Sequence, residues 1–209
     1  MDFCVADTKN NPLNPQYPSS SFPNLDLAIF RLSNCCALVQ EDMKGFYETA
    51  GLEKIPQIDF IFSWLRKREV SICLISDYSR EDTEIILRRL GWYPSTENSS
   101  IDAIILRRQL APTQLYLMAA QLMGLQDCRT SIALADQPEL LRGAAASKCL
   151  LTIGLNYGES SIREIAKAPT NTQLDTIGEL PNYLLQHLSL SHQIPKVDFP
   201  HLGRNGLPF

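Results

Sequence analysis

The sequence lacks long apolar runs, metal-ligand spacings and any excess of basic charge. A membrane-spanning helix needs roughly 20 consecutive apolar residues, so we expect no membrane segment. The N-terminus has an early acid and no apolar stretch, which argues against a secretory signal. The formal net charge of −4 offers no general basic surface for nucleic acid. We therefore expect a cytoplasmic protein that binds neither membrane nor nucleic acid.

Cysteine and histidine are also poorly placed for a metal site. No CxxC or Cys/His spacing typical of zinc occurs among the six cysteines and three histidines, and all the histidines are C-terminal. We expect most of the cysteines to be small buried hydrophobic residues in a reducing compartment. The cysteines are Cys4, Cys35, Cys36, Cys73, Cys128 and Cys149.

The chain divides into a central domain and two irregular arms. Residues 1–24 are rich in proline, which disfavours regular structure, and residues 189–209 again combine proline with glycine. The first arm is either an unpacked leader or a segment that packs over the domain or a neighbouring subunit through Tyr17 and Phe22. Residues 25–188 form the domain, and a hydrophobic content of 44% is enough for one core.

Within the domain, β-rich apolar runs alternate with helical patterns. Such alternation predicts βαβ units, hence a single-domain α/β fold with a doubly wound, Rossmann-like parallel sheet. The expected strands are residues 27–32, 70–76, 102–106, 130–135 and 149–154, with a short edge strand at 174–177. The expected helices are residues 40–52, 58–68, a segment capped by Ser79 or Asp77 and ended by Gly91, 112–124, 138–147, 162–168 and 180–188.

The exit of the first strand is where a ligand site is expected, because open parallel sheets bind ligands outside the carboxyl ends of their strands. The sequence there, Leu27–Cys36, places a cation, two small polar residues and two thiols at that exit, with no carboxylate.

The loops and helices together resemble the haloacid dehalogenase superfamily, and within it the phosphonatase-like branch, over roughly residues 25–188. The resemblance is strongest in strand order, helix lengths and the fragments GLEKIPQIDFIFSWLRKREVSICLISDYSR, LGW, LAPTQLYLMAAQLMGL and ADQPELLRGAAAS. It implies a capped hydrolase fold that uses an aspartate nucleophile and Mg²⁺.

The positions that match the family's motifs depart from its chemistry. Arg31 stands at the nucleophile position, Ser33 at the second acid, and Asn34 and Cys35 replace Gly-Thr. Ser76 matches the second motif. Further along, Gln109 aligns with the third-motif cation and Arg108 lies one place off, while Asp136 matches one metal-ligand acid of the fourth motif and Glu139 is one residue short of the other.

These departures predict loss of activity. A guanidinium cannot serve as a nucleophile, and Mg²⁺ wants several oxygen ligands, of which Asp136 alone is retained. The family's helical cap also has no room, since only residues 37–57 separate the first motif from the next helix. We therefore expect a capless, catalytically degenerate domain with no metal and no cofactor. The alternative is a hydrolase of this fold that acts on a phosphorylated or related small molecule by an altered mechanism and uses Mg²⁺.

Three hypotheses follow for the altered site. The first hypothesis is that Arg31 pairs with Asp136 in place of a metal and, together with Asn34, Cys35 and Ser76, binds a small anion. Its alternative is that Arg31 is a surface residue in a loop that has lost its function. Cys35 or Cys36 is a new nucleophile, or both are buried and inert. Finally, the domain serves as an assembly module that forms a homo-oligomer or binds a protein partner through its arms, or it is a monomer with unpacked tails.

Overall fold

The strands of the computed structural model, which describes residues 22, 24–39, 51–94, 99–156 and 162–188, form one main sheet. Within those residues six parallel strands run in the order β5-β4-β1-β6-β7-β8. Their bounds are β1 Leu27–Arg31, β4 Ser71–Ser76, β5 Ala103–Leu106, β6 Ser131–Ala135, β7 Leu151–Leu155 and β8 Thr172–Leu174. The predicted α/β fold with a doubly wound parallel sheet is thus confirmed.

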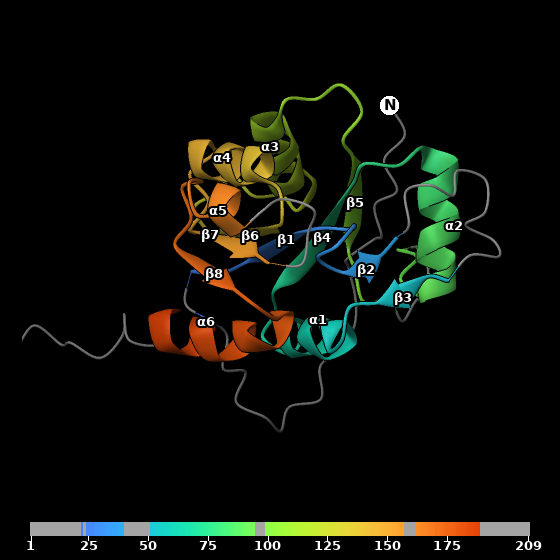
Figure 1. The fold of residues 1–209 in the computed structure, drawn as a ribbon, viewed down its shortest axis with the longest axis horizontal. Coiled ribbons are helices and arrows are strands. Elements are labelled where there is room, and N and C mark those ends of the chain that lie inside the picture. Colours follow the sequence, from blue (N-terminus) through green and yellow to red (C-terminus); the bar gives the residue numbers. More distant parts are fainter. Residues whose placement is uncertain (1–21, 23, 40–50, 95–98, 157–161, 189–209) are drawn as a thin grey trace, which may run out of the picture.

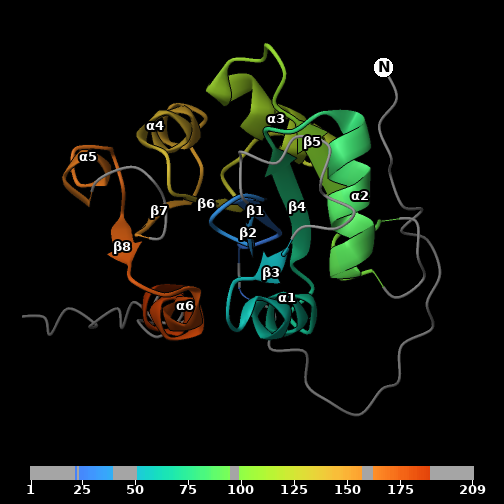
Figure 2. The ribbon, with the colours of Figure 1, turned by 45° about the vertical axis from the view of Figure 1, so that its right-hand side comes forward.

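Helices cover both faces of this sheet (Figures 1 and 2). Alternate residues of β1 show the division: Ala28 and Phe30 face one apolar cluster, Leu27 and Ile29 the other. The first cluster is completed by α1 (Ile58–Arg66), α2 (Arg80–Leu90) and α6 (Leu180–Leu188), and the second by α3 (Pro112–Leu122), α4 (Pro138–Ala146) and α5 (Ile162–Ile165). Because the central strands are buried on both faces, they read as continuous apolar runs.

Helix boundaries follow the capping residues. The Ser79 hydroxyl accepts a hydrogen bond from the Asp82 amide at the start of α2, and Gly91 ends that helix with a φ of 72°. Both features were predicted, and the Ser79 cap fixes the end of the loop that leads from β4 into α2. The edge strand β8 lies slightly earlier than predicted, and Ile177 instead begins the short 3-10 helix η2 (Ile177–Glu179), which leads into α6.

A small hairpin follows the first strand. Strands β2 (Ala37–Leu38) and β3 (Glu53–Lys54) pair antiparallel beside the main sheet, and Lys54 bonds Asp59 at 2.6 Å. The helix predicted for residues 40–52 falls mostly on residues 40–50, outside the described residues, and Gly51 and Leu52 are not helical. The predicted absence of a cap concerns the same segment and stays a prediction.

The last residues of the N-terminal arm are anchored to α1. The Phe22 ring is buried against the Trp64 ring, with centroids 5.4 Å apart, and the Arg68 guanidinium lies over both rings. Residue 22 therefore packs on the domain, as the second interpretation of the arm predicts; Tyr17 and the tail from residue 189 lie outside the described residues. No described helix is long and apolar enough to cross a membrane.

Candidate functional site

Four strand ends bring charged residues together at one edge of the sheet, called here the carboxyl edge. Strand β1 ends on Arg31 itself, and β4, β5 and β6 are each followed at once by a charged residue: Asp77, Arg107 and Asp136. These strands are neighbours in the order β5-β4-β1-β6, so their ends converge. The parallel topology therefore builds the site, as the rule for open sheets predicts.

The centre of this site is a buried ion pair between Arg31 and Asp136. Arg31 Nη1 donates hydrogen bonds to both Asp136 carboxylate oxygens, at 2.7 and 2.9 Å. The side chains are 3% and 1% exposed. The predicted pairing is present, and the opposing interpretation of Arg31 as a surface residue is wrong.

Further charges extend the pair into a network. Arg31 Nε donates to Asp77 Oδ2 at 2.7 Å, and the other Asp77 oxygen accepts from Arg107 Nη1 at 3.1 Å. Arg107 Nη2 reaches Glu139 Oε2 at 2.7 Å. The ends of β1, β4, β5 and β6 and the first turn of α4 are thus connected by side-chain hydrogen bonds.

The electrostatic balance favours a closed network. Burial opposes the charge of Arg31, but Asp136 and Asp77 outweigh it and raise the pKa of Arg31 above its ordinary value. Two guanidinium groups against three carboxylates leave the network with a net charge of −1. Arg31 is therefore neutralised by its neighbours and is not a free cation.

The other residues of the predicted anion site are held inside the protein. Asn34 Nδ2 donates to Asp136 at 3.1 Å, and the Cys35 thiol lies 3.7 Å from the same carboxylate. The Ser76 hydroxyl is fully buried, bonds Thr83 Oγ1 at 2.8 Å and accepts from the Tyr78 amide at 3.2 Å. These donors serve a carboxylate or a loop of this chain, so the arrangement favours internal pairing over capture of an anion.

Ser33, at the second-acid position, also has an internal partner. Its hydroxyl lies 2.6 Å from the Tyr78 hydroxyl, and its carbonyl lies 3.5 Å from Arg31 Nη1. The residue is buried, in the loop between β1 and β2. Ser33 thus helps to join the loops after β1 and β4 and offers no acid or base.

The cation near the third motif is a different residue from the one predicted. Arg108 is exposed in the turn after β5, with a φ of 41°, and Gln109 is exposed beside it. Arg107, one residue earlier, enters the network instead. Sequence reasoning missed both Arg107 and Asp77, although the rule applied to the exit of β1 would have found them if extended to the exits of β5 and β4.

The two adjacent thiols have the environment of core residues. Cys35 and Cys36 are fully buried. Burial raises the pKa of both thiols well above the ordinary value, and for Cys35 the Asp136 carboxylate acts in the same direction. A nucleophilic cysteine needs a stabilised thiolate, so the structure favours the buried, inert alternative.

The residues present do not fit a magnesium ion. Both oxygens of Asp136 already accept from Arg31, whose guanidinium would repel a cation. Glu139, the weak substitute for a second acid, is 60% exposed and pairs with Arg107. Among the described residues no group of three or more His, Cys, Asp or Glu side chains is arranged to hold a metal.

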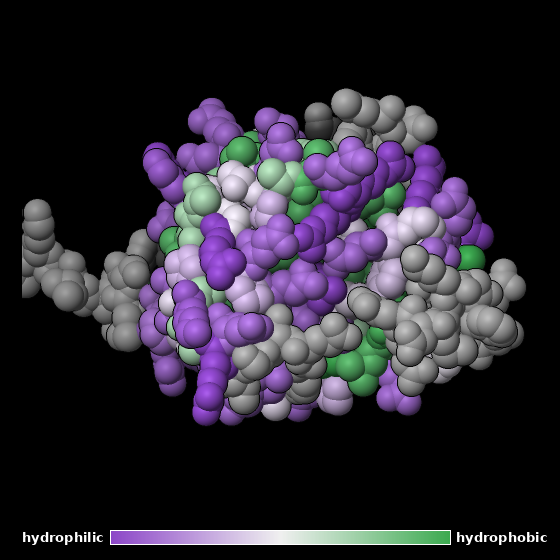
Figure 3. Space-filling view, turned by 45° about the horizontal axis from the view of Figure 1, so that its top comes forward, coloured by the Kyte–Doolittle hydropathy of each residue, from purple (hydrophilic) through white to green (hydrophobic). Residues whose placement is uncertain are grey.

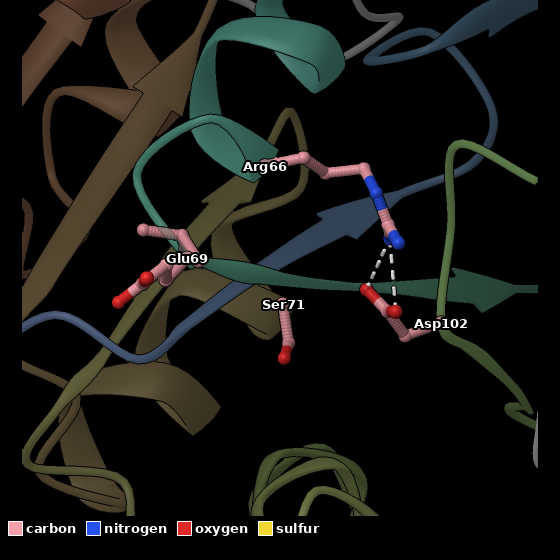
Figure 4. A pocket seen from close by; sticks show the side chains of 5 residues that line it. Arg66, Glu69, Ser71 and Asp102 are labelled. Carbon is pink, nitrogen blue, oxygen red and sulfur yellow. Dashed lines mark hydrogen bonds and ion pairs between the residues drawn. The ribbon is translucent and has the colours of Figure 1, made fainter. Parts of the chain in front are cut away.

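A small pocket lies at the opposite, amino edge of the sheet (Figure 4). It has a volume of about 140 Å³ and is lined by Arg66, Glu69, Val70, Ser71 and Asp102. Arg66 reaches from the end of α1 and donates to both Asp102 oxygens, at 2.9 and 2.8 Å, while the Ile72 amide donates to Asp102 at 2.7 Å. These bonds join α1, β4 and the start of β5, which indicates a structural role.

Comparison with known proteins identifies the fold. No family model matches the sequence, and no curated protein matches it. Solved structures do match: a conserved haloacid dehalogenase-like protein of unknown function from Agrobacterium tumefaciens has a TM-score of 0.62 at 13% identity, over 78% of this chain and 98% of that one.

Two further structures agree. A predicted phosphatase from Clostridium acetobutylicum gives a TM-score of 0.63 at 13% identity, over 78% of this chain and 99% of that one. A haloacid dehalogenase family hydrolase from Deinococcus radiodurans, with bound phosphate and sodium, gives 0.60 at 14% identity, over 78% and 96%. The chain therefore has the core fold of haloacid dehalogenase-like hydrolases and phosphatases.

Proposed function

We propose that this chain is a catalytically degenerate protein of the haloacid dehalogenase fold, in which an internal ion pair replaces the machinery for phosphoryl transfer. The observation that carries the proposal is the pair of bonds from Arg31 to both oxygens of buried Asp136. Phosphoryl transfer depends on charge placed around the transferred group. Here the first strand ends on Arg31, a cation, where a nucleophile is needed. Arg31 also forms hydrogen bonds with both oxygens of Asp136, the one acid that matches the family's metal ligands.

The phosphonatase-like branch and the missing cap belong to the same proposal. They rest on the sequence fragments and on the short interval between the first motif and α1. The cap would supply a Schiff-base lysine, whereas Lys54 lies in β3 and pairs with Asp59. Hydrolysis of phosphonoacetaldehyde is accordingly not expected.

The test compares the parent protein with an Arg31→Asp variant on a panel of phosphate esters, with and without Mg²⁺. We expect no turnover by the parent above a blank, and no rise in its melting temperature when Mg²⁺ is added. The variant brings a carboxylate to the end of β1 beside Asp77 and Asp136, so we expect Mg²⁺ to raise its melting temperature. Arg66→Asp makes the same charge change at the amino edge and serves as the matched control.

Turnover by the parent that requires Mg²⁺ and is lost in Asp136→Asn would overturn the proposal and support the alternative, a hydrolase with an altered mechanism. Asp136→Asn also separates the chain's own activity from that of a contaminating phosphatase, which the substitution would leave unchanged. Gain of turnover in Arg31→Asp would show that the remaining site still supports catalysis.

We propose assembly as the use of the retained fold, with the N-terminal arm as a contact surface. The packing of Phe22 against Trp64 and Arg68 favours this, because it fixes residue 22 of the arm on the surface of α1. Light scattering of the full chain tests the homo-oligomer. A mass of 23.5 kDa, that of one chain, would contradict it and leave a different protein as the partner.

A further inference from the structure

Two cysteines precede neighbouring strands at the amino edge, far from the ion-pair network. Cys128 lies shortly before β6 and Cys149 shortly before β7, and these strands pair in parallel with Ile132 opposite Leu151. The Ser131 amide donates to the Cys128 carbonyl at 2.9 Å, and the Leu150 amide donates to the Ser131 carbonyl at 2.8 Å. Two consecutive backbone bonds thus hold the two cysteines side by side.

Their side chains share one environment. Both belong to the apolar cluster between the sheet and helices α3 and α4, where Cys128 is fully buried and Cys149 packs against it partly exposed. The two thiols hydrogen-bond each other, and this bond lowers the pKa of Cys128 while it raises that of Cys149. The side chains of Cys128 and Cys149 are therefore neighbours, as a disulfide between them requires.

We propose that Cys128 and Cys149 form a redox modification site, which a peroxide converts into an intramolecular disulfide. Hydrogen peroxide transfers one oxygen to the sulfur of one cysteine of the pair and leaves as hydroxide; the sulfur of the other cysteine then attacks the resulting sulfenic acid and displaces a second hydroxide. The two thiol protons convert the hydroxides to water, so two thiols and one peroxide give one disulfide and two waters.

Access explains why this pair would react and the others would not. Cys149 is the one cysteine among those in the described ranges that is not fully buried. Cys35, Cys36 and Cys73 are fully buried, so an oxidant in the solvent does not contact their sulfur atoms. An oxidant therefore reaches Cys149 first, and Cys128 is the thiol next to it.

The disulfide would close a loop that contains β6, the Asp136 position and α4. Closing a loop of about 20 residues restricts the unfolded chain, so we expect the melting temperature to rise on the order of 5 °C. The oxidised protein would thus differ from the reduced one in stability as well as in mass.

The experiment treats the reduced full-length chain with hydrogen peroxide, alkylates the remaining thiols in denaturant and digests with trypsin. Cleavage after Arg108, Arg129, Lys148 and Arg163 places the two cysteines on separate peptides, 109–129 and 149–163, each with a single cysteine. We expect these peptides to be recovered linked, and the melting temperature to rise before reduction and return after it. Using Cys4→Ser throughout removes the thiol outside the described residues.

Oxidation in denaturant is the first control, because it removes the folded proximity and should lower the yield of this link about tenfold relative to other pairings. Cys73→Ser, in the same apolar cluster, is the matched variant and should leave the link unchanged. Recovery of both peptides alkylated after peroxide treatment, or linkage of either cysteine to a different one, would overturn the proposal.

Discussion

Two arginine–aspartate pairs lie at opposite edges of the same sheet, and their surroundings differ sharply. At the carboxyl edge Arg31 and Asp136 are 3% and 1% exposed; at the amino edge Arg66 and Asp102 are 41% and 11% exposed. In each pair one guanidinium nitrogen reaches both carboxylate oxygens at 2.7–2.9 Å. The hydrogen-bond distances of the two pairs are therefore nearly equal, whereas the exposed fractions of their side chains differ.

The difference separates two uses of the same chemistry. Asp102 also accepts a hydrogen bond from the Ile72 amide and so continues the pairing of β4 with β5. This bond does not depend on Arg66. Asp136 has instead Arg31, Asn34 and a thiol around it, and Arg31 is its one cationic partner among the described residues. A buried charge that loses its partner is costly, whereas Asp102 would keep its amide donor, and water can take the place of the 41% exposed Arg66 side chain.

The face turned forward in Figure 3 is mostly hydrophilic, and its hydrophobic atoms occur in small separate groups. Single groups of this kind are normal on a protein surface, and among the described residues of that face they mark no large apolar docking site. The distinguishing feature of the carboxyl edge is its internal pairing, which the following substitutions test.

The largest effect is expected for Arg31→Met, which keeps an unbranched side chain and removes its charge. It leaves Asp136 buried without a cation, so we expect a loss of about 3–5 kcal/mol in the free energy of unfolding. Urea unfolding followed by circular dichroism measures it. Arg66→Met is the matched control, and equal losses for the two variants would contradict the distinction drawn between the edges.

Much of this architecture could be predicted from the sequence, because each step was fixed by local chemistry. A continuous apolar run such as the one within Ser71–Ser76 is typical of a central strand in a parallel sheet. Capping by Ser79 and Gly91 fixed the limits of α2. The two-residue strands β2 and β3 could not be foreseen, since a hairpin so short carries no periodic signal.

The site was predictable at its centre and less so at its rim. Arg31 and Asp136 follow from their strands, whose register fixes where each side chain emerges. Arg107 was missed in favour of Arg108 because the choice depends on a turn: Arg108 has a φ of 41° and is exposed. A one-residue shift in a loop reverses which side chain faces the site, and no pattern of apolar residues records it.

A smaller effect is expected when both members of the buried pair are replaced by apolar residues. In Arg31→Met/Asp136→Leu no uncompensated charge remains at the centre, and Asp77 keeps Arg107. We expect this double variant to be more stable than Arg31→Met alone by about 2 kcal/mol in urea unfolding. Together with the Asp136→Leu single variant it completes a double-mutant cycle, which measures the coupling between the two positions. If the two substitutions simply add, then the ion pair is not the unit that holds the carboxyl edge.

The smallest effect is expected at the amino edge, where Arg66→Met should cost about 0.2–1 kcal/mol. Asp102 is buried but retains its bond from the Ile72 amide, and water can enter the space left by the 41% exposed Arg66 side chain. Salt sharpens the contrast, because about 1 M NaCl screens exposed charges far more than buried ones. In that salt, the loss in the free energy of unfolding should vanish for Arg66→Met and persist for Arg31→Met. If salt also removed the loss for Arg31→Met, then water would reach the buried pair. The carboxyl edge would in that case be open to solvent ions, against the closed ion pair on which the proposed loss of activity rests.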